Sequence, residues 1–216
     1  MGAHSRFPND MARTTPAPPP PTLVLLVRHG QTPTTGKVLP GRAPGLHLAE
    51  AGVQQAQRAA ERIAELQRVD AIHVSPLERA RETAAPIAAA RTLRVRIDRG
   101  LLECDFGDWT GGELAKLSKL PEWQTVQRAP STFTFPGGES FTAMQTRIVS
   151  AVDRIRAAHP GGVVVCVSHA DPIKALVAHA MGTHLDLFQR IVISTCSITA
   201  IAYGTGAPVV LTVNST

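Results

Sequence analysis

The stretch LVLLVRHG, residues 23–30, decides the fold. Residues 23–27 are all apolar, and a short apolar run that ends at a glycine-containing loop is typical of a strand buried on both faces. Such a strand lies near the centre of a sheet that helices cover on both sides. Ligands of these sheets bind beyond the carboxyl ends of the strands, so Arg28 and His29 come where a ligand is expected.

The apolar pattern predicts further strands and a first helix. Apolar runs of strand length occupy residues 71–74, 163–167, 198–203 and 209–213. Between residues 50 and 66 apolar side chains recur at helical spacing, which predicts a helix packed on one face of the sheet. The positions that carry this pattern are Val53, Ala56, Ala60 and Ile63.

Two more helices are predicted from their start signals. The sequence SPLE at residues 75–78 has a cap residue in Ser75, a proline at the first helical position and a glutamate at the third. A helix is therefore expected from Pro76 to about Arg91. Asp171 and the proline after it repeat the start signal for a helix that reaches about Met181.

Strands that alternate with helices predict a three-layer α/β/α fold with a mostly parallel central sheet. Residues 103–138 are rich in aromatics, glycine and proline and have weaker periodicity, which indicates a short lid-like insertion that selects the substrate. Because residues 16–21 are almost all proline, residues 1–21 are predicted to be a disordered leader. The folded domain is then expected to span residues 22–216.

Composition narrows the classes of function. The 22 Lys and Arg residues exceed the 17 Asp and Glu residues, which suits acidic ligands, but they are dispersed along the chain. Aromatic residues make up only 4% of the chain, so a nucleic-acid-binding surface is not expected. No metal is predicted, because Cys104, Cys166 and Cys196 are far apart and lack metal-site spacing. Without a secretory signal or a long apolar run, the chain is expected to be cytoplasmic and free of membrane contact.

Two histidines follow predicted strands. His29 follows residues 23–27 and His169 follows residues 163–167, so the two imidazoles face each other across one crevice if these strands are neighbours. Arg79 lies one turn into a predicted helix, close to the same edge of the sheet. Helix N-termini and the guanidinium groups of Arg28 and Arg79 would favour a phosphoryl group in this crevice.

Five segments, in order along the chain, resemble the phosphoglycerate-mutase-like branch of the histidine phosphatase superfamily. They are LLVRHG at residues 25–30, SPLERA at 75–80 with Thr83, LE at 102–103 with FGDWTG at 106–111, PGGES at 136–140, and VSH at 167–169. A lone RHG is a weak signal, whereas the ordered set is specific. The resemblance extends over residues 23–216 and implies the same α/β fold.

The resemblance also implies a role for each matched residue. His29 would accept the phosphoryl group as phosphohistidine, while Arg28, Arg79 and His169 would hold the phosphoryl oxygens. Glu103 would protonate the leaving alkoxide and then activate water. Cationic neighbours independently favour a neutral, nucleophilic His29. No metal or other cofactor is expected, because arginines and imidazolium can supply the charge stabilisation.

Three further positions are expected to bind the substrate. Thr35 stands six positions after His29, where many relatives have Asn, and Ala170 replaces the glycine usual after the second histidine. Arg42 lies where loops of the family contact the substrate. Among the aromatic residues of the insertion, Trp109 and Trp123 are expected to pack it onto the core, and one of Phe133 and Phe135 to line the pocket.

The expected activity is hydrolysis of a small phosphorylated metabolite, and phosphoryl transfer within one substrate is the alternative. Phosphoglycerate mutases have a longer insertion with an arginine pair, whereas residues 104–135 contain only Arg128. Residues 123–127 and 184–191 nevertheless resemble a subgroup commonly labelled phosphomutase. A non-catalytic phosphate-binding module is the third hypothesis, and the presence of both His29 and Glu103 argues against it. The apolar terminal strands would accept a second copy of the chain, as in a homodimer or a higher homo-oligomer.

Overall fold

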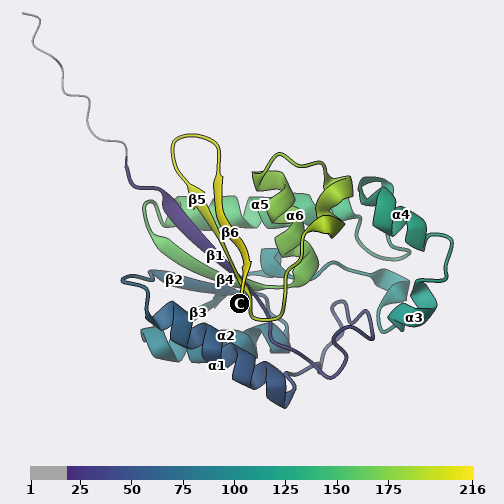
Figure 1. Ribbon diagram of the computed structural model, residues 1–216, viewed down its shortest axis with the longest axis horizontal. Helices are drawn as coiled ribbons and strands as arrows, with labels where there is room; N and C mark the ends of the chain where they lie inside the picture. The colour runs from purple at the N-terminus through teal and green to yellow at the C-terminus, as the bar shows by residue number, and fades with distance from the viewer. Residues whose placement is uncertain (1–18) are drawn as a thin grey trace, which may run out of the picture.

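The computed structural model describes residues 19–216, so most of the predicted leader, residues 1–18, lies outside the described residues. A six-stranded sheet forms the middle layer, with helices on both faces (Figure 1). Its strands are β1 (Thr22–Arg28), β2 (Ala71–Val74), β3 (Val95–Ile97), β4 (Val163–Ser168), β5 (Ile198–Tyr203) and β6 (Val209–Ser215). The helices are α1 (Glu50–Ala64), α2 (Glu78–Arg91), α3 (Leu114–Leu117), α4 (Trp123–Arg128), α5 (Phe141–Ala158) and α6 (Ala170–Ala180).

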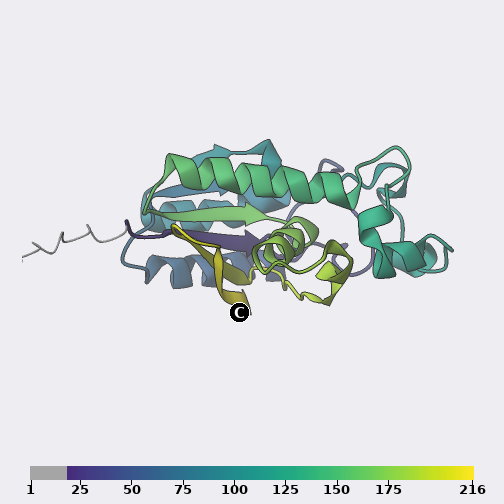
Figure 2. The ribbon, with the colours of Figure 1, turned by 90° about the horizontal axis from the view of Figure 1, so that it is seen from above.

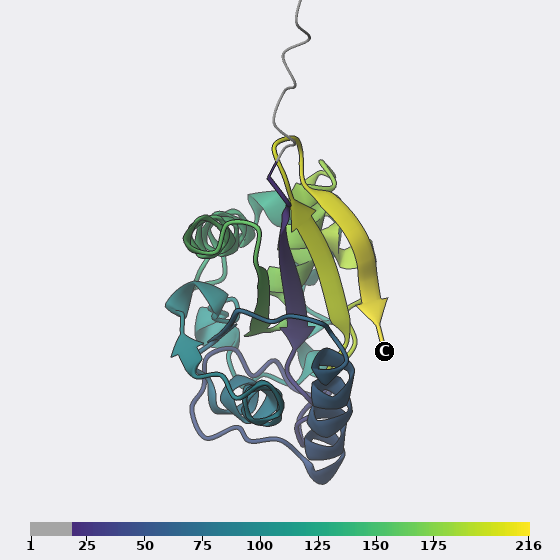
Figure 3. The same ribbon diagram turned by 90° about the vertical axis from the view of Figure 1, so that its left-hand side faces the viewer.

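The strand order is β3-β2-β4-β1-β5-β6. The first four strands in this order are parallel. β5 runs antiparallel to its neighbours β1 and β6, and β6 forms one outer edge of the sheet (Figure 3). The central pair is β1 and β4, in which Val27 lies opposite Val167 and Arg28 opposite Ser168. This pairing confirms the predicted mostly parallel three-layer fold and brings the ends of the two histidine-bearing strands together.

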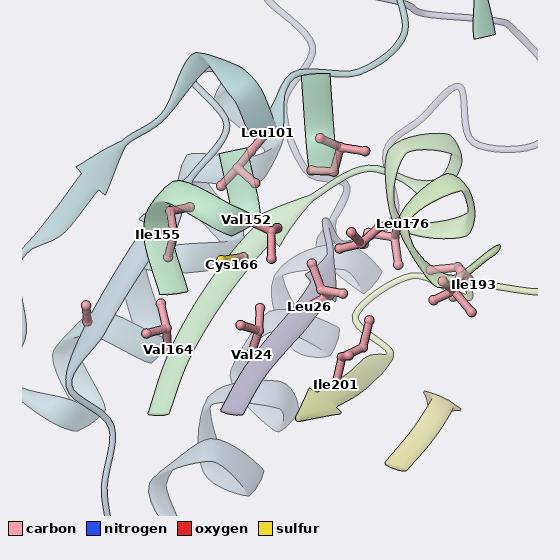
Figure 4. Close-up of a cluster of buried hydrophobic side chains, with 14 residues drawn as sticks. Val24, Leu26, Leu101, Val152, Ile155, Val164, Cys166, Leu176, Ile193 and Ile201 are labelled. Carbon is pink, nitrogen blue, oxygen red and sulfur yellow. The ribbon is translucent and has the colours of Figure 1, made fainter. Parts of the chain in front are cut away.

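The alternating side chains of β1 enter two separate cores, which explains its unbroken apolar sequence. Val24 and Leu26 pack against α5 and α6 on one face, in the cluster shown in Figure 4. Leu25 and Val27 pack against α1 and α2 on the other face. All four side chains are buried, so β1 is fixed from both sides.

The starts of α2 and α6 differ from the predictions. Leu77 is still extended and is the N-cap of α2, so the helix begins at Glu78 instead of Pro76. The Ser75 hydroxyl therefore stands two residues before the N-cap and does not cap this helix; it hydrogen-bonds His169. His169 in turn is the N-cap of α6, which places Asp171 inside the first turn.

Two other helices correct the expectations. In α1, Val53 is 57% exposed although the other predicted positions are buried, and the helix ends at Ala64. No helix was predicted at residues 141–158, where α5 is the longest helix among the described residues. Its start has the expected chemistry, since the Ser140 hydroxyl accepts a hydrogen bond from the Ala143 amide.

Residues 103–138 hold the short helices α3 and α4 and lie at the end of the molecule toward which β1 and β4 point (Figure 2). An aromatic cluster joins this insertion to the core, with Phe135 in edge contact with both Trp109 and Phe141 of α5. Trp109 stacks on Trp123, as its predicted packing role requires. No helix within residues 19–216 is both long and apolar enough to cross a bilayer.

Candidate active site

His29 follows the last residue of β1 and is 5% exposed. Its Nδ1 lies 2.8 Å from the Gly30 carbonyl oxygen, which can only accept a hydrogen bond, so Nδ1 carries the proton. Nε2 then carries a lone pair, which accepts a hydrogen bond from Arg79 Nε over 3.3 Å. Burial lowers the pKa of His29 to about 3, and the Arg79 charge adds to this effect. The imidazole is therefore neutral near pH 7, and Nε2 is its unprotonated nitrogen.

The loop that carries His29 is held by close backbone packing. A Cβ on Gly30 would stand 2.6 Å from the Gly52 carbonyl oxygen, and a Cβ on Gly52 would stand 2.1 Å from the Gln31 carbonyl oxygen. The Gly30 amide also donates to the Thr83 hydroxyl of α2 over 3.0 Å. The start of α1 and the first turns of α2 thus fix the loop from two sides.

Two arginines flank His29. Arg79 is fully buried on α2 and donates through Nη2 to the Gly41 carbonyl oxygen at 2.8 Å. Arg28 donates through Nη1 to the Ile193 carbonyl oxygen at 2.7 Å. Each arginine keeps a buried nitrogen without a hydrogen-bond partner in the described part of the chain, Nη1 of Arg79 and Nε of Arg28. Because unpaired buried donors are costly, these atoms mark a place for an anion.

His169 lies against His29, with ring centroids 5.1 Å apart. Its Nε2 lies 2.7 Å from the Ser75 hydroxyl, and its Nδ1 is buried without a partner among residues 19–216. Burial lowers the pKa of His169 well below its usual value, with the Arg79 charge as the next cause. His169 Nδ1 is therefore a third buried group without a partner beside the two arginines.

Glu103 is 7% exposed and follows the end of a short helical turn at residues 99–101. Burial raises the pKa of its carboxyl to about 7; the nearby Asp171 charge also raises this pKa, whereas the Arg79 and Arg28 charges lower it. One carboxyl oxygen accepts from the Cys104 amide over 3.0 Å. A carboxyl with this pKa can both give and take a proton near neutral pH.

Behind Glu103 lies a network of charged side chains. Arg42 donates to the Glu103 carbonyl oxygen at 2.9 Å and pairs with Glu139 and Asp105. Arg147 of α5 donates to Glu139 and to the carbonyl oxygen of Leu102. The network fixes the backbone of the loop that carries Glu103.

These side chains surround a hollow of about 200 Å³. Five predicted site residues line it: Arg28, His29, Thr35, Glu103 and Ala170. Arg79 and His169 contact His29 but are not among the residues that line this hollow. Arg42 does not line the hollow, because its guanidinium group is taken up by the network behind Glu103.

The apolar wall of the hollow also differs from the prediction. Neither Phe133 nor Phe135 lines it, because both are buried in the aromatic cluster of the insertion. Phe106 lines the hollow instead, together with Leu39 and Leu114. A larger hollow of about 480 Å³, lined by His47, Val95 and others, contains neither His29 nor His169.

Sequence reasoning missed three contributors, Ser75, Arg147 and Asp171. The local sequence around Ser75 and Asp171 is that of helix caps, which does not indicate a site. Arg147 lies on α5, a helix that the sequence pattern did not predict. Within residues 19–216 no group of three or more His, Cys, Asp or Glu side chains is arranged to hold a metal ion. What the arrangement offers is a neutral imidazole, cationic donors around it and a protonatable carboxyl at the same hollow.

Comparison with known proteins gives consistent matches. The model of the histidine phosphatase superfamily (branch 1) matches residues 24–216. The bifunctional protein Rv2228c of Mycobacterium tuberculosis is 37% identical over 91% of this chain, and the match covers 54% of that protein. The chain thus spans about half the length of this relative. Phosphoserine phosphatase 1 of Hydrogenobacter thermophilus is 30% identical, over 89% of this chain and 92% of the relative.

A solved structure shares the same architecture. The native structure of mycobacterial glucosyl-3-phosphoglycerate phosphatase superposes with a TM-score of 0.80. It is 27% identical in sequence, and the match covers 90% of this chain and 99% of the other. The similarity therefore extends over most of the chain.

Proposed function

Because the chain belongs to branch 1 of the histidine phosphatase superfamily, we propose that it hydrolyses small phosphate monoesters through a phosphohistidine on His29. The observation that carries the proposal is the protonation state of His29. Its Nδ1–H is committed to the Gly30 carbonyl oxygen, so Nε2 keeps a lone pair beside buried cationic donors.

In the first step His29 Nε2 attacks phosphorus, the P–N bond forms and the P–O bond to the alcohol breaks. Glu103 gives its proton to the leaving alkoxide, for which a pKa of about 7 is suited. Arg28, Arg79 and His169 hold the three phosphoryl oxygens, over which negative charge is spread in the transition state. The amide of Ala170, at the start of α6, and the Thr35 hydroxyl add contacts to the bound phosphoryl group.

In the second step the Glu103 carboxylate takes a proton from water, and the oxygen of that water attacks phosphorus. The P–N bond breaks, inorganic phosphate leaves, and His29 and Glu103 return to their starting protonation states. No step uses a metal ion, since the charge stabilisation comes from the two arginines and the imidazole of His169.

Hydrolysis is preferred over transfer within one substrate for two reasons. Two of the relatives reported above are named phosphatases. In addition, Arg28 is the one arginine among the described residues that line the hollow, and it adjoins His29. A mutase must hold its phosphorylated intermediate while the substrate turns, and among the described residues that line the hollow no Lys or Arg besides Arg28 could grip it.

The test is hydrolysis of p-nitrophenyl phosphate by the wild type and by His29→Ala, each with excess EDTA. We expect steady turnover in the wild type and a loss of at least about 10³-fold in the variant, since the nucleophile is gone. No turnover by either protein would favour a binding module. Activity that requires added divalent metal would contradict the metal-free mechanism, and isomerisation of 3-phosphoglycerate without phosphate release would indicate a mutase.

A further inference from the structure

The walls of the hollow carry an unusual balance of charge for a site that binds a phosphate ester. Two carboxyl groups line it, Glu103 and Asp171, against the single guanidinium group of Arg28. No lysine lines it in the described part of the chain. The remaining walls are hydroxyls, backbone and apolar side chains such as Leu39 and Phe106.

Asp171 stands in the first turn of α6, two residues after His169. Its side chain is 18% exposed, and Oδ1 pairs with Lys174 at 3.3 Å, one helical turn further along. Lys174 also contacts Gln189 Oε1 at 3.2 Å and does not line the hollow. The pairing uses only one carboxylate oxygen, and the negative charge of Asp171 still reaches the hollow, because it raises the pKa of Glu103.

The groups of the site that can bind an anion are used by the phosphoryl group in the mechanism proposed above. Arg28, Arg79 and His169 would each bind a phosphoryl oxygen, so none of them is left for a second anion on the substrate. The alcohol part of the substrate must then lie beside Glu103, which protonates it, and near Asp171. A carboxylate on that alcohol would meet like charge without a cation to pair with it.

We propose that Asp171 makes this site selective for phosphate monoesters of neutral or cationic alcohols and disfavours alcohols that carry a carboxylate. The inference rests on the proposed phosphatase function and names its substrate class. It also separates this chain from two relatives whose names cite phosphoserine and glucosyl-3-phosphoglycerate, since both compounds carry a carboxylate.

The presence of Asp171 has an alternative explanation, which is its position at the start of α6. An acidic residue in the first turn of a helix interacts favourably with the helix dipole and raises stability, whatever the substrate. Under that explanation Asp171→Asn lowers stability and changes the rates for all esters by a common factor. Selectivity between two esters is therefore the readout that distinguishes the two explanations.

The experiment uses two pairs of esters that differ by one carboxylate. Glycerol 3-phosphate is compared with 3-phosphoglycerate, and phosphoethanolamine with phosphoserine. For each pair kcat/KM is measured from released phosphate. In the wild type we expect the ester without the carboxylate to be preferred by about tenfold or more. Asp171→Asn, which keeps the shape and removes the charge, should reduce that preference by about fivefold or more.

The matched control is Asp153→Asn. Asp153 forms an i,i+3 ion pair with Arg156 on α5, at 2.8 Å, and lies outside the hollow, so its loss removes the same charge from a remote position. It should leave both ratios unchanged. Equal or better hydrolysis of the carboxylate esters by the wild type, or ratios that Asp171→Asn leaves unchanged, would overturn the inference. Failure to hydrolyse even p-nitrophenyl phosphate would instead overturn the proposed function.

Discussion

The surroundings of Glu103 suit its carboxyl both to donate and to accept a proton, the two tasks that the proposed mechanism gives it. Burial and the charge of Asp171 hold its pKa at about 7, so the carboxyl is protonated below neutrality and ionised above it. The acid form is needed to release an alkoxide, and the base form to activate water. His29, with a pKa of about 3, keeps its lone pair across the same range.

The pH dependence of the first step follows from these two values. With an alkyl phosphate, kcat/KM should fall as the pH rises above about 7, because the raised pKa marks the loss of the Glu103 proton. No loss from His29 is expected on the acid side until far below pH 5, since its pKa is about 3. Profiles of kcat/KM measured between pH 5 and 9 check both expectations, the decline above pH 7 and the absence of a decline from His29 on the acid side.

Glu103→Gln supplies the matching variant. It should lower kcat/KM for an alkyl phosphate by about 10²- to 10⁴-fold and remove the decline near pH 7. With p-nitrophenyl phosphate the loss should be far smaller, because nitrophenolate leaves without a proton. The exposed Glu61→Gln on α1 serves as the control. An equal loss for both esters would show that Glu103 does not act as the acid.

At the residue level, the sequence predicts the site residues that stand next to a recognisable local pattern, such as an apolar run or a helix start. Arg28 and His29 follow one apolar run, and His169 follows another. Arg79 follows a helix start. These residues share one edge of the sheet because the two apolar runs form neighbouring parallel strands. Ser75 shows the limit, because its partner His169 is 94 positions away and its local pattern is that of a helix cap. In the structure the helix begins later, with Leu77 as its N-cap, and the Ser75 hydroxyl contacts His169.

At the level of elements, the contact between the His29 loop and α1 depends on two glycines. Gly52 lies in the first turn of α1, where helix propensity alone would favour alanine by about 1 kcal/mol. The space does not allow it, because the new Cβ would stand 2.1 Å from the Gln31 carbonyl oxygen. The backbone of either element must then move.

Gly52→Ala should therefore lower the free energy of unfolding by about 1–3 kcal/mol, the reverse of what propensity predicts. It should also lower kcat, since the displaced loop carries His29. Gly206→Ala is the control, because a Cβ at Gly206 meets nothing within 4 Å. Denaturant unfolding and kcat measured together check the prediction, and a more stable, fully active Gly52→Ala protein would contradict it.

The elements were predictable where one pattern dominates. All five predicted strands exist within a residue or two, because each is an apolar run of strand length. The missed α5 has buried residues at helical spacing, namely Met144, Ile148, Val152 and Ile155. It directly follows the glycine- and proline-rich end of the insertion, which is typical of a loop and obscures the start of the helix. Val53 has the helical spacing of a core residue but is exposed, because periodicity predicts which face of a helix packs and not how far along the helix the packing extends.

At the scale of the whole molecule, the sheet brings the site together from distant segments. β1 and β4 are separated by more than a hundred positions in the chain, yet they pair in parallel and end side by side. α5 adds Arg147 behind the Glu103 loop, and the insertion adds Phe106 to the wall. The homo-oligomer stays a prediction; Val209 and Leu211 of the edge strand β6 are exposed and are where a second copy would pair.

The most direct test of the account is to locate the phosphoryl group during turnover. Excess enzyme is mixed with a radiolabelled phosphate monoester, quenched rapidly in alkali, in which phosphohistidine survives, and digested for mass spectrometry. We predict one phosphoryl group on His29, its absence in His29→Ala, and its presence in the control His47→Ala, whose histidine is exposed. A phosphoryl group on any other residue, or label retained by His29→Ala, would contradict the account.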